Sequence, residues 1–181
     1  YKRQNYDNVR VPESHLIGEV NRRRTTGKIA RGGFATKEAL YADVLGHAQR
    51  IYDQVAAYAK ERKGAGRPII QHANIAAMLG EAAANLEAAR AFVYRAAWEH
   101  DEEVKEERQT NTFWSGHAVF YVVKKMALRL CEIAYDVYGG VGGSVELDLG
   151  RFIRRVYTWY APGQTANMNT IECSRGYNRH I

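Results

Sequence analysis

Two groups of residues in the sequence could bind a phosphate-bearing ligand. Arg62 comes at the end of a long predicted helix, where its forked, always-charged guanidinium could hold a phosphate or interact with the free carbonyl groups of the helix end. Gly139 and Gly140 follow another predicted helix, and backbone without side chains could approach a ligand closely or cap that helix. From the residues alone, the helix-end explanation is favoured for both groups.

Other residue types that could do chemistry have spacings that argue against a site. The six histidines include no i,i+4 pair and no HExxH, so no metal site is predicted, and His72 is interpreted as a packed or surface residue. The acidic run from Asp101 is interleaved with Lys105, which is typical of a solvated face. Cys131 and Cys173 are far apart, which favours buried thiols over a disulfide or a zinc site.

Composition places the chain among ordinary folded domains. With 46% hydrophobic residues, 25% charged residues and three prolines in 181 residues, it is neither disordered nor low in complexity. The net charge of +6 permits polyanion binding, but the tyrosines follow helix-core spacing, which disfavours nucleic acid. No apolar run approaches the roughly 20 residues of a membrane span. We therefore expect a soluble, cytoplasmic protein, and the start at Tyr1 suggests a longer polypeptide or processing.

The elements that must position these residues are predicted to be mainly helical. Apolar residues recur at three- and four-residue steps over 36–63, 70–100 and 115–138, which indicates three long helices, each with one buried face. Shorter helices are expected over 146–157 and 166–176, and a charged break over 101–110. Long amphipathic helices joined by brief loops form an antiparallel bundle, so the predicted fold class is all-α.

The first 33 residues are expected to differ from the bundle. The alternating residues 8–15, which include Pro12, predict a short strand, and a lone strand needs partners from a sheet outside this chain. Arg22 to Gly33 is predicted to be a solvated connector.

The order of these motifs resembles the C-terminal half of the acyl-CoA dehydrogenase family of flavoproteins. The matching segments, in chain order, are Val9-Arg-Val-Pro12, Leu45-Gly46, Tyr58 to Gly66, Leu86-Glu-Ala-Ala-Arg90, Ala96 to Asp101, Tyr138 to Glu146, and Arg154. The resemblance implies that 1–33 is the end of a middle β domain with its connector, and that 34–181 is a C-terminal four-helix-type bundle. It also implies homo- or hetero-dimers or tetramers built through the bundle.

The resemblance further implies a site for FAD. Arg62 would contact the flavin phosphates, and Gly139 with Gly140 would lie near the adenine half of a cofactor shared with a neighbouring subunit. Thr165 and Asn167 fall where the family contacts flavin phosphates or ribose, although simple N-capping explains them equally well.

Several positions depart from the family pattern. The aromatic residue of its R-x-x-F-G motif is Ala65 here, and two glutamines that commonly contact flavin are Ala73 and Asp136. The family's catalytic glutamate falls at Gly163 or, in other members, at Thr36, and neither residue can act as a carboxylate base. Glu38 is the nearby carboxylate, two residues from Thr36 and so on a different side of the helix.

Three functional hypotheses follow from the resemblance. The first is an FAD-dependent dehydrogenase that oxidises an acyl-CoA at its α,β-carbons and passes electrons to electron-transfer flavoprotein or another acceptor. The second is a relative with other flavin chemistry, such as a desulfinase or an oxidase. The third is a catalytically silent structural subunit of a hetero-oligomer.

Overall fold

The computed structural model describes residues 5–15, 28–106, 113–159 and 166–178. The chain divides into two units, Tyr1–Gly33 and Phe34–Ile181. In the first unit, Glu13–His15 forms the short 3-10 helix η1, closed by the His15 N–H donating to the Pro12 carbonyl at 2.9 Å. The strand predicted over 8–15 is not formed among the described residues. A strand requires a hydrogen-bonded neighbour, and none of the described segments supplies one.

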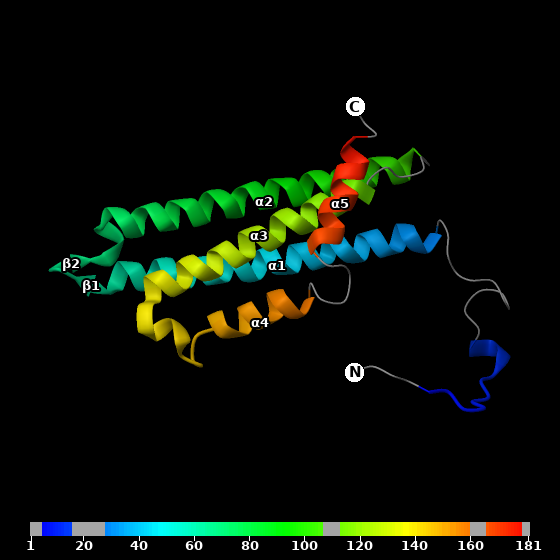
Figure 1. Ribbon diagram of the computed structural model, residues 1–181, viewed down its shortest axis with the longest axis horizontal. Coiled ribbons are helices and arrows are strands. Elements are labelled where there is room, and N and C mark those ends of the chain that lie inside the picture. The colour runs from blue at the N-terminus through cyan, green and yellow to red at the C-terminus, as the bar shows by residue number, and fades with distance from the viewer. Residues whose placement is uncertain (1–4, 16–27, 107–112, 160–165, 179–181) are drawn as a thin grey trace. The chain divides into compact units, whose positions relative to one another are not determined.

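The second unit is a bundle of antiparallel helices. In Figure 1, α1, α2, α3 and α4 alternate in direction along the bundle, and α5 crosses α3. The helices and strands from α1 onward are α1 (Lys28–Glu61), β1 (Lys63–Gly64), β2 (Arg67–Pro68), η2 (Ile69–Gln71), α2 (Ala73–Lys105), α3 (Phe113–Tyr138), η3 (Gly139–Gly143), α4 (Leu149–Trp159) and α5 (Ala166–Tyr177). Residues 28–33 of α1 belong to the first unit and the rest of α1 to the second. The prediction of an all-α antiparallel bundle is confirmed.

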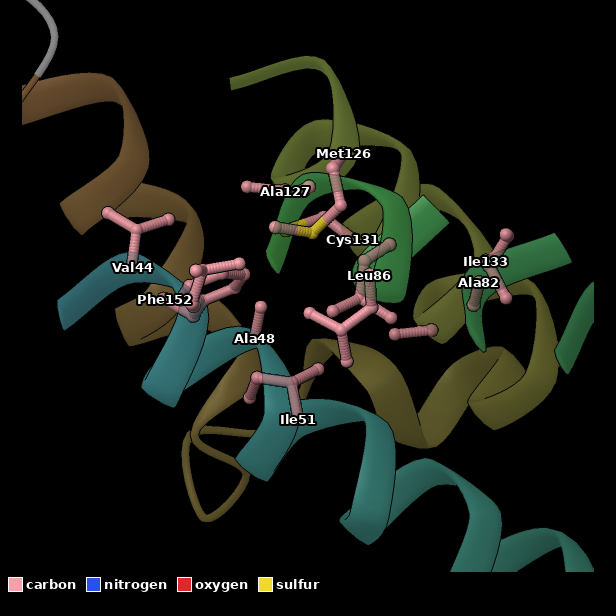
Figure 2. Packing of buried hydrophobic residues seen from close by; sticks show 14 of the residues in the cluster. Val44, Ala48, Ile51, Ala82, Leu86, Met126, Ala127, Cys131, Ile133 and Phe152 are labelled. Carbon is pink, nitrogen blue, oxygen red and sulfur yellow. The ribbon is translucent and has the colours of Figure 1, made fainter. Parts of the chain in front are cut away.

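The core lies along seams that repeat every three or four residues. On α2, large and small residues alternate at this spacing, so that each leucine or valine is followed by an alanine. The buried residues of this seam are Leu79, Ala82, Leu86, Ala89, Val93 and Ala96. Figure 2 shows Leu86 packed among residues of α1 and α3. This spacing is the knobs-into-holes pattern of helix bundles, and the alanines let neighbouring helices approach closely.

Two predicted helix boundaries were wrong, because both helices are longer in the structure than the sequence predicts. Helix α1 begins at Lys28 rather than at Thr36 and includes Gly32 and Gly33, which had been assigned to a connector. Helix α2 continues through the acidic run to Lys105, whose ammonium group lies 2.7 Å from Glu102. The two glycines cost the helix only about 2 kcal/mol together, and an i,i+3 ion pair supports an exposed turn, so neither feature ends a long helix.

A hairpin with two residues in each strand connects α1 to α2. Strands β1 and β2 pair antiparallel, with Lys63 opposite Pro68 and Gly64 opposite Arg67. The turn residues Ala65 and Gly66 both have left-handed backbone, with φ of 48° and 82°. Two consecutive left-handed residues are the requirement of the tight turns that match strand twist. The sequence had indicated only a helix break here.

Apolar burial holds α4 onto the bundle, and a polar contact joins α5 to it. Helix α4 buries Leu149, Phe152 and Val156, and α5 is joined to α3 by His117, whose Nδ1 lies 2.6 Å from Asn169 Oδ1. Within the described part of the chain, no helix is both long and apolar enough to cross a membrane.

Candidate functional site

An open cavity of about 720 Å³ lies where the hairpin meets the end of α3. Figure 1 shows this end of the bundle, with β1 and β2 beside the last turns of α1 and the first of α2. The volume falls within the range usual for ligand sites, about 300–1,000 Å³. The lining residues are Tyr58, Arg62, Lys63, Gly64, Ile69, His72, Asn74, Ile75, Asp136, Val137, Tyr138, Gly139, Gly140 and Val141.

Arg62 and the two glycines, 77 and 78 residues apart in sequence, line this same cavity. Arg62 directly follows α1, and its backbone is held at both ends. Its N–H donates to the Tyr58 carbonyl, and its own carbonyl accepts from the Ile69 N–H, both at 2.8 Å. Its exposed guanidinium makes no ion pair or hydrogen bond to any described residue. The charge is therefore available to an anion.

Gly139 has the two properties that the sequence left as alternatives. It directly follows α3 and has a φ of 59°, the left-handed geometry that ends helices. It also lines the cavity, as does Gly140, and a Cβ built on either residue would meet no protein atom within 4 Å. The space above this backbone is open, so capping the helix and receiving a ligand are compatible.

Two tyrosines pack together beside the cavity and join α1 to α3. The rings of Tyr58 and Tyr138 have centroids 4.9 Å apart and are tilted by 58°. Burial raises the pKa of the Tyr138 phenol, with further contributions from Tyr58 and from the charge of Asp148. The shift adds to the preference for the protonated hydroxyl that any tyrosine has at neutral pH.

The hairpin side of the cavity contains residues that the sequence prediction missed. His72 Nε2 lies 3.0 Å from the Gly64 carbonyl, and its Nδ1 lies 3.4 Å from Arg67 Nη2. Lys63 adds a second positive charge, and Asp136 is the one acidic residue among those lining the cavity in the described chain. The charged residues within 60–67 were the available sign of a ligand site in the sequence. The hairpin that brings these residues together was not predicted.

The remaining predicted residues are placed elsewhere or lie outside the described residues. Asn167 is exposed on α5, its carbonyl accepts from Thr170 Oγ1 at 2.9 Å, and it does not line the cavity. Thr165 and Gly163 fall outside the described residues. Glu38 lies within α1, but nothing is described of its side chain. The flavin role of Asn167 and Thr165 and the catalytic role of Glu38 stay predictions.

The sequence over residues 36–171 matches the family model described as "Acyl-CoA dehydrogenase, C-terminal domain". The chain belongs to the acyl-CoA dehydrogenase family. Cyclohexane-1-carbonyl-CoA dehydrogenase of Syntrophus aciditrophicus is 30% identical over 82% of this chain and 36% of its own length. The caffeyl-CoA reductase–Etf complex subunit CarC of Acetobacterium woodii is 32% identical over 85% of this chain and 39% of its own length.

Solved structures have the same arrangement of helices. Butyryl-CoA dehydrogenase from Megasphaera elsdenii superimposes with a TM-score of 0.72 at 24% identity, over 84% of this chain and 38% of that one. PigA, solved with FAD and proline, gives a TM-score of 0.72 at 21% identity, over 82% of this chain and 37% of that one. The chain thus spans less than two-fifths of the length of these relatives. The sequence resemblance is confirmed.

Proposed function

We propose that this chain is the C-terminal helical domain of an FAD-dependent acyl-CoA dehydrogenase and that its hairpin-end cavity receives the phosphate-bearing part of the cofactor. The observation that carries the proposal is the convergence of Arg62, Gly139 and Gly140 on one cavity. A guanidinium is suited to phosphate because its forked donors match two phosphate oxygens.

The residues of the cavity fit such a group. Arg62 and Lys63 supply positive charge, and the unobstructed backbone of Gly140 allows close approach. Asp136 would repel a phosphate placed beside it, but a carboxylate can accept hydrogen bonds from ribose hydroxyls. The cavity is open on one side, as expected if a neighbouring subunit completes the site, so a homo- or hetero-dimer or tetramer is part of the proposal.

FAD, when bound, would accept a hydride from the β-carbon of an acyl-CoA thioester. The part of this chain is to bind and orient the cofactor through Arg62, Lys63 and the glycine backbone. A carboxylate must also remove the α-proton, and Thr36 and Gly163 cannot do so. The base would come from Glu38 or from sequence outside this chain, and electrons would pass to electron-transfer flavoprotein or another acceptor.

The residues at the two usual positions of the catalytic glutamate, Thr36 and Gly163, favour a second candidate function. A relative that uses flavin for desulfination or oxidation, or a structural subunit paired with a flavin-competent partner, does not need the usual glutamate. Thr36 and Gly163 are the observation in favour of these alternatives. Purified protein that is yellow and bleaches anaerobically with an acyl-CoA supports the dehydrogenase. Yellow protein that does not bleach supports other flavin chemistry, and protein that turns yellow only with a partner supports the structural role.

The cofactor site can be tested with two variants and a matched control. Arg62→Gln removes the charge, and Gly140→Ala fills part of the open space without straining the backbone. We expect the Kd for FAD, followed by flavin fluorescence, to rise roughly tenfold or more in each variant. Arg62→Gln loses a charged hydrogen bond, which contributes about 1.5–3 kcal/mol. Gly140→Ala places a methyl group in the space that the ligand would occupy. Arg95→Gln is the control, because Arg95 is an exposed α2 arginine paired with Glu99. Equal affinity in all four proteins would refute the assignment.

A further inference from the structure

His72 joins the hairpin to the start of α2. It lies between η2 and α2, and its ring contacts both strands, Gly64 of β1 at 3.0 Å and Arg67 of β2 at 3.4 Å. Its backbone is also engaged, because its N–H donates to the Ile69 carbonyl and its carbonyl accepts from the Ala76 N–H, both at 3.0 Å. One half-buried residue thus connects four consecutive elements, β1, β2, η2 and α2, beside the cavity.

The two ring contacts define the protonation state of His72. A carbonyl oxygen only accepts, so Nε2 must carry the proton that it donates to Gly64. A guanidinium only donates, so Nδ1 must be unprotonated to accept from Arg67. Both contacts are satisfied together only by the neutral imidazole with its proton on Nε2. In the imidazolium form, two donors and two positive charges would face each other at Nδ1.

The hairpin that His72 contacts is short and has a strained turn. Each strand has two residues, and the turn places Ala65 in a left-handed conformation that residues with a Cβ rarely adopt. Isolated two-stranded hairpins are marginal in water. The hairpin nevertheless carries Lys63 on its first strand and starts directly after Arg62. Its position therefore sets where the two positive charges of the cavity lie.

We infer that His72 is a positioning residue for the cofactor site: its neutral imidazole holds β1 through the Gly64 carbonyl and thereby fixes Arg62 and Lys63 beside the cavity. The inference rests on the proposed function for the identity of the ligand. It also has a consequence independent of any ligand, which is that loss of the His72 ring contacts loosens the hairpin. The charged residues that share the hairpin or the cavity with His72 are Arg67, Arg62, Lys63 and Asp136.

Two conservative variants separate the contacts of His72. The amide nitrogen of His72→Gln can replace Nε2 as the donor to Gly64, whereas the amide oxygen of His72→Asn can replace Nδ1 as the acceptor from Arg67. His72→Ala removes both contacts, and His47→Ala is the control, since His47 lines a different cavity against Phe152. At about pH 7.5 the variants carry no charge at position 72, so differences in affinity between them report position and not charge.

The first measurement is amide hydrogen exchange at Ile69, whose N–H is bonded to the Arg62 carbonyl. We expect exchange roughly three- to tenfold faster in the Ala and Asn variants, and within about twofold of the parent protein in the Gln variant, since one hydrogen bond is worth about 0.5–1.5 kcal/mol. Unchanged exchange in the Ala variant, or no rescue by Gln, would overturn the inference.

The second measurement is the Kd for FAD at about pH 7.5. It should rise roughly three- to tenfold in the Ala and Asn variants and be restored by Gln. If the parent protein binds FAD and the Ala variant binds it equally well, His72 does not position the cofactor site. If the parent protein binds no FAD, the proposed function fails instead, and the exchange rates alone decide whether His72 holds the hairpin.

Discussion

Arg155 on α4 forms an ion pair with Asp43 on α1, which lies 112 residues earlier in the sequence. One guanidinium nitrogen, Nη2, lies 3.0 and 2.8 Å from the two carboxylate oxygens. Both side chains are about one-third exposed, at 35% and 30%. The pair lies on the polar edge of α4, whose apolar residues are buried in the bundle. The ion pair thus fixes α4, the helix that follows the cavity residues Gly139 and Gly140.

Replacing Asp43 with alanine should loosen α4. The partly buried Arg155 would lose its carboxylate partner, so we expect the free energy of unfolding to fall by about 1 kcal/mol, a value reduced by the solvent exposure of the pair. Urea denaturation measures the change. Asp53→Ala is the matched control, because Asp53 on the same helix is exposed and accepts a hydrogen bond from Gln49 in the preceding turn. Equal losses in the two variants would show that the pair does not stabilise α4.

The glycines of η3 should differ sharply in their tolerance of a side chain. Gly142 is buried, and a Cβ there would lie 2.8 Å from Cδ1 of Tyr135, whereas a Cβ on Gly143 would meet nothing within 4 Å. Gly142→Ala should therefore lower the free energy of unfolding by about 1–3 kcal/mol through overpacking. Gly143→Ala should stay within about 0.5 kcal/mol of the parent protein. Thermal or urea unfolding of both variants checks this, and equal stability would refute the close approach.

The turn of the hairpin should be stabilised by glycine. Ala65 has a φ of 48°, where a Cβ is strained and glycine is not. We expect Ala65→Gly to raise the free energy of unfolding by about 0.5–1 kcal/mol. The same change at Ala57, exposed within α1, should lower it by about 1 kcal/mol because glycine is a poor helix former. If both variants are destabilised, the left-handed turn is not the conformation in solution.

The periodicity of the sequence predicted the bundle well because helix faces are a local property. Residues such as Val55, Leu86 and Ile133, expected inside from their spacing, are buried. Arg62 and Gly140 could be singled out only through the family resemblance, since the residues alone favoured helix-end roles. That they line one cavity depends on how α1 and α3 pack, which no local pattern encodes.

The errors were made where tertiary structure overrides local signals. Gly64, Gly66 and Pro68 indicated a break, but the antiparallel pairing of Gly64 with Arg67 depends on two left-handed residues, one of them an alanine. His72 had no recognisable motif, because its role depends on the hairpin folding back toward α2. Helix α1 extends through Gly32 and Gly33 because two glycines cost a helix of 34 residues only about 2 kcal/mol in total.

The two thiols should differ in reactivity. Burial raises the pKa of Cys131 to about 12, with a smaller contribution from the neighbouring Glu132, and the residue is 5% exposed. Cys173, which is only half-buried, also has a raised pKa because of burial. Since the thiolate is the reactive form, iodoacetamide at about pH 8 should label Cys173 well before Cys131. Mass spectrometry of the labelled peptides measures the order, and urea should equalise the rates. Prompt labelling of Cys131 in the folded protein would contradict its burial.

The carboxylate of Asp148 should make stability depend on pH below neutrality. A hydrogen bond from Gln54 and the charge of Arg50, 2.7 Å away, hold its pKa below the ordinary value of 3.8. Because the pKa is lower in the folded state, the contribution to stability is fully present above 3.8 and is lost as the pH falls through the native pKa. Asp148→Asn should therefore be less stable than the parent protein at about pH 6, and the gap should close as the pH falls through the lowered pKa of Asp148. Urea midpoints measured across this range test the prediction, which fails if the gap between the two proteins is the same at every pH.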